Sequence, residues 1–178
     1  MVLTTSYRKG LFLAILLSCF SLASSQDSPF LSKKESKFVN GFFSEGWSAE
    51  ELVLGDPDPG LFLEGDQVHI LKQEDDLLGY LISTRAIGRY DYFDYLLAFD
   101  PDFSVLGITV TVYRSTHGAA ICQKKWLSQF EAYAGGELSY GKDIDALSGA
   151  TISATSLVKD VQRCYQIMIN LKGEGLIH

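Results

Sequence analysis

Apolar and polar residues in the middle of the chain follow patterns typical of β-strands. Four strand-like runs follow one another, at about residues 68–72, 77–87, 92–100 and 104–113. The first run alternates, and the last is rich in the Val, Ile and Thr residues that favour strands. Turn-forming residues separate neighbouring runs, at Glu74 to Asp76 and at Asp100 to Asp102. Because short turns join antiparallel neighbours, the pattern predicts an antiparallel meander.

Apolar residues with helical spacing lie on both sides of these strands. Phe38, Val39, Phe42 and Phe43 predict a short amphipathic helix near the N-terminus. A 3.6-residue repeat after Gly118 predicts a second helix before a pair of glycines. The positions of this repeat are Ile121, Lys125, Trp126, Gln129 and Tyr133.

The longest helix is predicted at the C-terminus, from about Ser153 to Lys172, with an apolar stripe and Gly173 as its stop. An antiparallel meander sheet with helices packed on it is an α+β architecture. We therefore expect one α+β domain over residues 67–178, preceded by a helical or irregular segment at 26–66.

The first 25 residues have the layout of a secretory signal peptide. Arg8 and Lys9 precede an apolar run at 10–20, and small residues at 23–25 offer a cleavage site. A second interpretation is open, because residues 16–19 resemble a bacterial lipobox in which Cys19 becomes the lipid-modified first residue. A third is an uncleaved anchor. All three predict a folded part outside the cytoplasm, in the periplasm or at the outer face of a membrane.

The net charge, the histidines and the two cysteines after the predicted signal peptide exclude some classes of partner and of catalytic site. The net charge of −7 argues against nucleic acid as the main partner. His69, His117 and His178 lack metal-ligand spacing, and no nucleophile elbow, Rossmann glycine pattern or P-loop is present. Cys122 and Cys164 could pair in an exported protein. The free form is favoured, because Cys164 lies on the apolar stripe of the last helix.

The strongest candidate for chemistry is the stretch Asp145-Ala-Leu-Ser148-Gly149-Ala150-Thr151, just before the last helix. Backbone amides are unpaired at a helix start, which suits a phosphate. Ser, Gly and Thr are also common helix-start residues, so these residues alone would indicate only a cap. The context adds weight: a carboxylate precedes, an amphipathic helix follows, four strands lie upstream and an export signal is present.

The Asp-x-x-Ser-Gly-Ala-Thr pattern resembles the flavinylation motif of the FMN-binding domain family. That family includes flavin-carrying subunits of the sodium-pumping NADH:quinone reductase and of Rnf-type complexes, and small exported electron carriers. The likeness extends over about residues 67–172, through the strand–turn–strand at 92–108 and the helix around 126–130. It implies that a flavin transferase, with FAD as donor, attaches FMN through a phosphoester to Thr151.

The resemblance also assigns roles to the residues before Thr151. Gly149 and Ala150 would keep the site open to the transferase, and Ser148 would cap the helix. Asp145 would orient Ser148 or Thr151, or meet a metal of the transferase. The implied cofactor-binding set is therefore Asp145, Ser148, Gly149, Ala150 and Thr151.

The chain departs from the family where many members have Glu-Thr-Pro-Gly, because it has Ser115-Thr116-His117-Gly118. His117 could donate a proton beside a flavin, although an exposed loop histidine is the favoured interpretation. The aromatic residues from Tyr90 to Tyr95 could form a wall beside the ring, and sheet packing is favoured for most of them.

The implied protein is an exported electron carrier rather than a turnover enzyme. Its partners would be a flavin transferase and membrane-bound redox proteins, with Cys19 as an optional membrane tether. Two alternatives remain at this point. One is an exported binding or scaffolding module without flavin, and the other is a flavin reductase that acts on a small diffusible acceptor.

Overall fold

The structure is a computed structural model that describes residues 31–55 and 58–178. The predicted signal peptide, its lipobox alternative and Cys19 lie outside the described residues. Among the residues that are described, no helix has the length and apolar character needed to span a bilayer.

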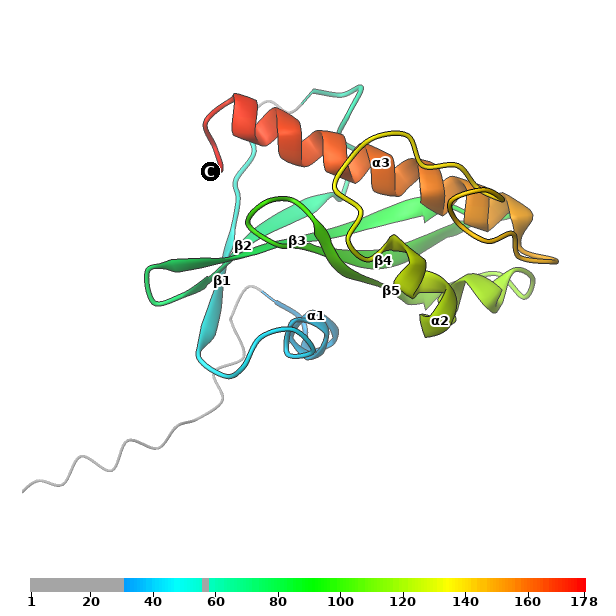
Figure 1. The fold of residues 1–178 in the computed structure, drawn as a ribbon, viewed down its shortest axis with the longest axis horizontal. Helices are drawn as coiled ribbons and strands as arrows, with labels where there is room; N and C mark the ends of the chain where they lie inside the picture. Colours follow the sequence, from blue (N-terminus) through cyan, green and yellow to red (C-terminus); the bar gives the residue numbers. More distant parts are fainter. Residues whose placement is uncertain (1–30, 56–57) are drawn as a thin grey trace, which may run out of the picture.

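One antiparallel sheet of five strands forms the centre of the molecule (Figure 1). The strands lie side by side in chain order and are β1 (Trp47–Glu51), β2 (Gln67–Gln73), β3 (Asp76–Ile87), β4 (Tyr92–Phe99) and β5 (Val105–Tyr113). The helices are α1 (Lys33–Val39), α2 (Lys124–Leu127) and α3 (Thr151–Gly173), with 3-10 turns η1 (Ala119–Cys122) and η2 (Ser128–Phe130). The predicted α+β fold, an antiparallel meander with helices packed on it, is confirmed.

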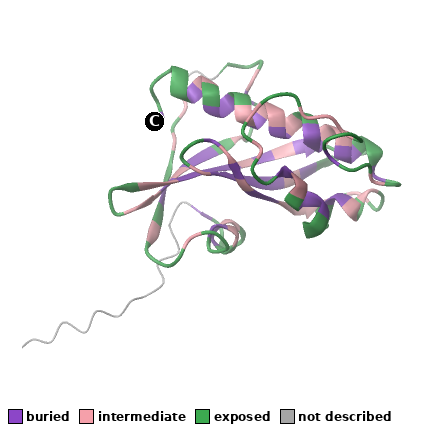
Figure 2. Ribbon diagram, viewed as in Figure 1, coloured by how far each residue is buried: buried purple, intermediate pink, exposed green. Residues whose placement is uncertain are grey.

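The sheet buries both of its faces. Helix α3 covers one face, where Leu157, Val161 and Met168 belong to the same core cluster as Tyr95 and other strand residues. Helix α1 covers part of the other face, where Val39 packs in a smaller cluster with strand leucines and alanines. Figure 2 shows the buried residues along the strands and the inner side of α3. Burial on both faces explains why β4 is almost continuously apolar instead of alternating.

Strand β1 corrects the expectation for residues 26–66. That segment does contain the predicted helix, α1, whose capping box joins Ser32 and Glu35. It also contains β1, which pairs with β2 from Trp47 opposite Gln73 to Glu51 opposite His69. In β1 only Ala49 is buried, so the strand has no apolar alternation that could predict it. Its pairing with β2 is a tertiary effect.

The predicted helix over 121–133 is broken into η1, α2 and η2. After η2 the backbone turns at Ala132, which has a positive φ of 64°. The chain then pairs with β5, because the Ala132 amide donates to Val105 O and the Val105 amide donates to Tyr133 O. These sheet-edge contacts, together with burial of Trp126 and Phe130, outweigh the helical periodicity.

Candidate functional site

The candidate site lies at the N-terminal end of α3, opposite the end of the molecule that carries the C-terminus (Figure 1). The helix begins at Thr151, two residues earlier than predicted, and Ala150 is its N-cap residue. Its first internal bond runs from the Ala154 amide to Ala150 O at 2.9 Å. The amides of residues 151–153 therefore have no carbonyl partner within the helix, and they carry the positive end of its dipole.

No side chain caps this helix. The expectation that Ser148 would cap it is therefore wrong, because α3 starts three residues after Ser148 rather than directly behind it. The uncapped start leaves its amides available to another acceptor, and an anion is the acceptor that the dipole favours.

A fixed turn leads the chain into α3. The Ala150 amide donates to Leu147 O at 3.2 Å, and Gly149 takes a φ of +73° that glycine adopts without strain. The Leu147 amide donates to the Tyr140 hydroxyl at 2.7 Å. These contacts hold the predicted motif in one conformation although most of it is exposed.

Asp145 is held by its main chain. Its carbonyl accepts a hydrogen bond from Trp126 Nε1 at 2.8 Å, and its amide donates to the Gln129 side chain at 2.9 Å. The residue is exposed. The motif is thereby tied to the α2–η2 segment through backbone atoms, and the carboxylate is left at the surface.

An open cleft of about 180 Å³ brings three segments together at the start of α3. Its lining residues come from the turn between β3 and β4, from the loop after β5 and from α3 with its preceding turn. They are Arg89, His117, Gly118, Gly149, Ala150, Thr151, Ile152 and Ser153. Of the predicted site residues, Gly149, Ala150 and Thr151 line this cleft, and Asp145 and Ser148 do not.

Tyr113 fixes the loop that forms the far wall of the cleft. Its hydroxyl donates to His117 O at 2.6 Å and lies 3.1 Å from the buried Ser153 Oγ. Gly118 has a φ of +88°, and a Cβ there would lie 2.5 Å from the Tyr113 hydroxyl. A larger residue than glycine at position 118 would therefore displace the loop from the helix start.

The cleft combines three features that suit a phosphate group. Thr151 is exposed and offers a hydroxyl, the helix start offers unpaired amides, and Arg89 offers a guanidinium that binds phosphate oxygens well. Beside Thr151, a Cβ on Gly149 would have nothing within 4 Å, so the approach is open. The site can hold a phosphate or carry a phosphoester on Thr151.

Comparison with known proteins agrees with this chemistry. Residues 88–166 match the family profile of the FMN-binding domain. This part of the chain is an FMN-binding domain. The resemblance seen in the sequence is thereby confirmed, and the matched range contains all residues that line the cleft.

No curated protein sequence matches the chain. Among solved structures, the crystal structure of Shewanella oneidensis NqrC is similar, with 15% sequence identity and a TM-score of 0.48. The similarity covers 74% of this chain and 82% of that one.

The aromatic residues near the site of the FMN-binding domain divide into two groups. Phe93 and Tyr95 are fully buried in the core, as the packing interpretation expects. Tyr90 and Tyr92 are exposed, and the Tyr90 ring lies edge-on to His117 with a centroid distance of 6.4 Å. His117 is itself an exposed loop histidine at the rim of the cleft, and its Nδ1 lies 3.0 Å from Thr116 Oγ1.

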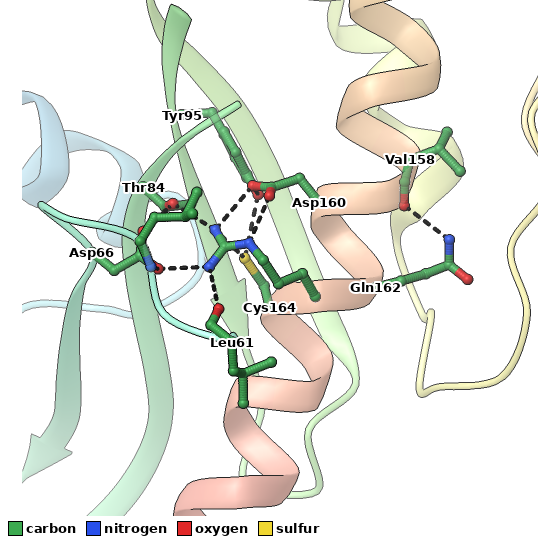
Figure 3. A network of polar contacts seen from close by, with 10 residues as sticks. Leu61, Asp66, Thr84, Tyr95, Val158, Asp160, Gln162 and Cys164 are labelled. Carbon is green, nitrogen blue, oxygen red and sulfur yellow. Dashed lines mark hydrogen bonds and ion pairs between the residues drawn. The ribbon is translucent and has the colours of Figure 1, made fainter. Parts of the chain in front are cut away.

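A buried polar network fixes the helix that carries Thr151 (Figure 3). Arg163 of α3 forms 2.6 Å ion pairs with Asp66, from the segment before β2, and with Asp160 of its own helix. Arg163 also donates to Thr84 of β3 at 2.9 Å. The guanidinium thereby ties α3 to both the sheet and the loop beside it.

Tyr95 extends the network into the core, since its hydroxyl donates to Asp160 at 2.6 Å and lies 3.3 Å from the Cys164 sulfur. Burial, with the charges of Cys164 and Asp160, raises the pKa of Tyr95 well above its usual value, so the phenol stays protonated and donates. Burial is the largest single effect on the pKa of Arg163 and lowers it, but the hydrogen bonds to Asp160 and Asp66 and the charges of Cys164 and Asp160 together outweigh burial, so the pKa is raised. The arginine is charged at every working pH.

The sequence predicts Thr151 and its approach, and it offers Ser153 as a further hydroxyl, but it does not predict that Arg89 and Ile152 line the cleft. Arg89 lies in a four-residue turn, and no spacing in the sequence connects it with residue 151. The pattern predicts Ser153 as the first residue of the helix and gives no sign of its contact with Tyr113. Both cysteines in the described part of the chain are free, Cys164 buried and Cys122 exposed.

Proposed function

We propose that this protein is an exported electron carrier in which FMN is joined through a phosphoester to the hydroxyl of Thr151. The observation that carries the proposal is the position of Thr151. It is the exposed first residue of an uncapped helix, and it opens into a cleft lined by Arg89 within an FMN-binding domain.

Attachment requires a flavin transferase with FAD as the donor. The Thr151 oxygen attacks the phosphorus of the FMN half of FAD, the bond to the AMP half breaks, and AMP leaves as the hydroxyl proton is lost. The helix-start amides and Arg89 would stabilise the negative oxygens of the phosphoester. Once attached, FMN supplies the electron-transfer chemistry, and the chain supplies position and electrostatics.

The site favours an electron carrier over a turnover enzyme because its cleft is small and open. About 180 Å³ beside Thr151 accommodates the phosphate end of the cofactor and leaves little room for a second, sequestered substrate. The predicted export signal extends the proposal to a location outside the cytoplasm, with membrane-bound redox proteins as partners. A covalent bond would retain the cofactor where free FMN is scarce.

Co-production with a flavin transferase tests the attachment. The intact mass should rise by FMN minus water, and the denatured band should fluoresce as flavin. Thr151→Val should abolish both signals, because valine has the shape of threonine without its hydroxyl. Thr155→Val, one turn further along α3, should retain both.

Two outcomes would contradict the proposal. If the wild-type protein gains no mass, it is not a covalent flavin carrier. If Thr151→Val still gains FMN, the attachment site is another hydroxyl, and peptide mapping of Ser148, Ser153 and Thr155 would locate it.

A further inference from the structure

Strand β5 lies at one edge of the sheet, next to β4 (Figure 1). Its outer side is paired at its first residue, where the Val105 amide donates to Tyr133 O and the Val105 carbonyl accepts the Ala132 amide. Beyond Val105, no backbone group of the described residues pairs with that outer side. The edge over 107–112 is therefore open, and an open strand edge can pair with a further extended chain.

A groove of about 540 Å³ runs along this open edge. Residues 107–111 of β5 line it without interruption. Because successive side chains of a strand point to opposite faces of a sheet, five consecutive lining residues mean that the backbone edge itself forms the floor. Five residues of extended chain span about 17 Å, which is the length of a short strand.

Two segments form the walls of the groove. One is α1 with the residues that follow it, and the other is the α2–η2 segment; their side chains in the groove include Lys34, Lys37, Phe38, Phe42, Lys124 and Glu131. The Phe42 ring closes on the backbone of Gly107, where a Cβ would lie 2.6 Å from Phe42 Cζ. Phe38 packs edge-on against Phe42, with ring centroids 5.1 Å apart. The α1 wall therefore offers an aromatic surface to the side chains of a chain lying in the groove.

The groove also carries an excess of positive charge. Lys34, Lys37 and Lys124 line it together with one acidic residue, Glu131. No ion pair among the described residues includes any of these four side chains. The Lys34 ammonium donates to Thr111 O at 3.2 Å, a bond that leaves its charge in place.

The nearby acidic side chains lie in a different hollow. Glu35, Glu64 and Asp94 line that hollow, which shares Lys34 with the groove. Glu35 caps the first turn of α1 through a 2.6 Å bond, and Asp94 forms a 2.6 Å ion pair with the arginine that follows β5. Glu64 shares the hollow with a second cation, Arg85. Negative charge is therefore concentrated in the hollow, and positive charge in the groove.

We propose that this groove, here called the β5-edge groove, binds an extended acidic segment of a partner protein, which adds a strand to the sheet beside β5. Main-chain hydrogen bonds to the open edge would hold the segment, and its carboxylates would face Lys37 and Lys124. The proposal does not depend on the proposed function, because the β5-edge groove and the cleft at Thr151 share no lining residue.

The shape of the groove favours an extended segment over two other occupants. A symmetric pairing with a second copy would bring two β5 edges together. Both strands lie at the floor of a groove, so the walls would meet before the strands, and the lysines of the two copies would repel one another. A bilayer surface could reach the lysines at the rim, but it supplies no backbone that pairs with the strand.

A short synthetic peptide that alternates glutamate and valine serves as the probe. It is titrated into the isotopically labelled exported protein, produced without a flavin transferase, at about 0.1 M salt, where the Debye length is about 10 Å. Amide NMR shifts should map to residues 107–112, and cross-peaks between the peptide and β5 amide protons should show strand pairing. The absence of β5 shifts at about 1 mM peptide would overturn the proposal.

Charge reversal in the walls tests the role of the lysines. Lys37→Glu/Lys124→Glu should weaken binding of the peptide by about tenfold or more, because both ammonium groups line the groove. The matched control is Lys33→Glu/Lys125→Glu, which makes the same change in net charge at exposed positions of the same two helices outside the groove. It should weaken binding by less than about threefold. Equal losses in the two double variants would reject the groove as the binding site.

Backbone methylation of the peptide tests the strand pairing itself. Two further peptides are made, one N-methylated at every valine and the other at every glutamate. Since the amides of an added strand face β5 at every second residue, one methylated peptide should lose binding and the other should retain it. Equal behaviour of the two would overturn strand addition.

Two further outcomes would assign the groove to another occupant and overturn the proposal. The first is a set of β5 shifts that grow with protein concentration in the absence of peptide, which would indicate a second copy. The second is co-sedimentation with phosphatidylglycerol vesicles that Lys37→Glu/Lys124→Glu abolishes, in a protein that does not bind the peptide. FMN loading on Thr151 is measured separately by intact mass, so neither result bears on the proposed function.

Discussion

At the scale of single residues, Asp145 and Thr151 are held in place by different parts of the fold. Thr151 belongs to the first turn of a long helix, so its position is set by the whole of α3. Asp145 is placed only by its carbonyl and amide, and its carboxylate is not needed to hold the loop. If the carboxylate has a role, we therefore expect it in the proposed attachment of the flavin rather than in folding.

Asp145→Asn should leave the free energy of unfolding within about 0.5 kcal/mol of the wild type, because no described contact uses the carboxylate. It should lower the fraction of protein that gains FMN from the transferase. Urea unfolding measures the first quantity and intact mass the second. If Asp145 acts by orienting Ser148, then Ser148→Ala should lower FMN loading as well. Normal loading of Ser148→Ala would leave the other two roles, which are orienting Thr151 and meeting a metal of the transferase.

Two glycines of the cleft test how strongly the backbone constrains the site. Gly118→Ala combines a left-handed φ with a close approach to the Tyr113 hydroxyl, and it should cost about 1–3 kcal/mol of stability. Gly149→Ala has a similar φ but open space around it, so about 1 kcal/mol is expected. Urea unfolding of both variants gives the comparison. Equal losses would mean that the Tyr113 contact does not constrain the loop.

The two cysteines should differ in reactivity. Burial and the charge of Asp160 raise the pKa of the Cys164 thiol, so iodoacetamide should not modify it in the folded protein. Cys122 is exposed, although partial burial of its thiol raises its pKa. A raised thiol pKa means less thiolate at neutral pH, so alkylation of Cys122 should be slower than that of a free thiol and should accelerate as the pH rises above neutral. Peptide mapping by mass spectrometry distinguishes the sites, and native modification of Cys164 would contradict its burial.

At the scale of elements, α3 depends on the Arg163 network for its attachment to the sheet. Arg163→Met would leave Asp66 and Asp160 without their cation in an environment where the three side chains are at most 16% exposed. Removing one partner of a buried ion pair costs about 3–5 kcal/mol. We expect a loss of this size by urea unfolding. Lys159→Met, at an exposed position of the same helix, should change stability by less than about 0.5 kcal/mol.

The elements that the sequence predicts well are those whose own residues determine them. Strands β2 to β5 are separated by turn residues, and α1 has its capping box, so local patterns suffice. Strand β1 and the broken helix around Trp126 depend on pairing with β2 and β5, which no local pattern encodes. The residues of the candidate site also differ in whether a local pattern can predict them. Thr151 lies in a contiguous motif, whereas Arg89 joins it only after the hairpin and α3 have folded together.

At the scale of the whole molecule, the positions of the cleft, of α1 and of the C-terminus determine how the domain could meet a membrane. The cleft lies at the start of α3, and the C-terminus lies at the other end of that helix (Figure 1). Helix α1, the first described element, is on the opposite face of the sheet. An attachment to a membrane through the N-terminal segment would therefore leave the cleft side of the molecule open to a partner.

Cleavage of the signal peptide and lipidation of Cys19 lead to different predictions for how the domain is held at a membrane. Cleavage near Ser25 would release a soluble chain that begins at Gln26, and lipidation would keep Cys19 as a diacylated first residue. Leu31 follows Cys19 by twelve positions, so a lipid anchor would hold the domain within about 40 Å of the bilayer. That distance would confine the carrier to partners in or on the same membrane.

Mass spectrometry of the exported protein decides between these interpretations, since only a lipidated N-terminus adds acyl mass. Cys19→Ser supplies the matching test: it should release a lipidated protein from the membrane fraction but leave the size and distribution of a protein cleaved near Ser25 unchanged. In either case FMN loading on Thr151 should persist, because the attachment site belongs to the folded domain. Loss of loading in Cys19→Ser with normal export would mean that the transferase acts only on membrane-held protein.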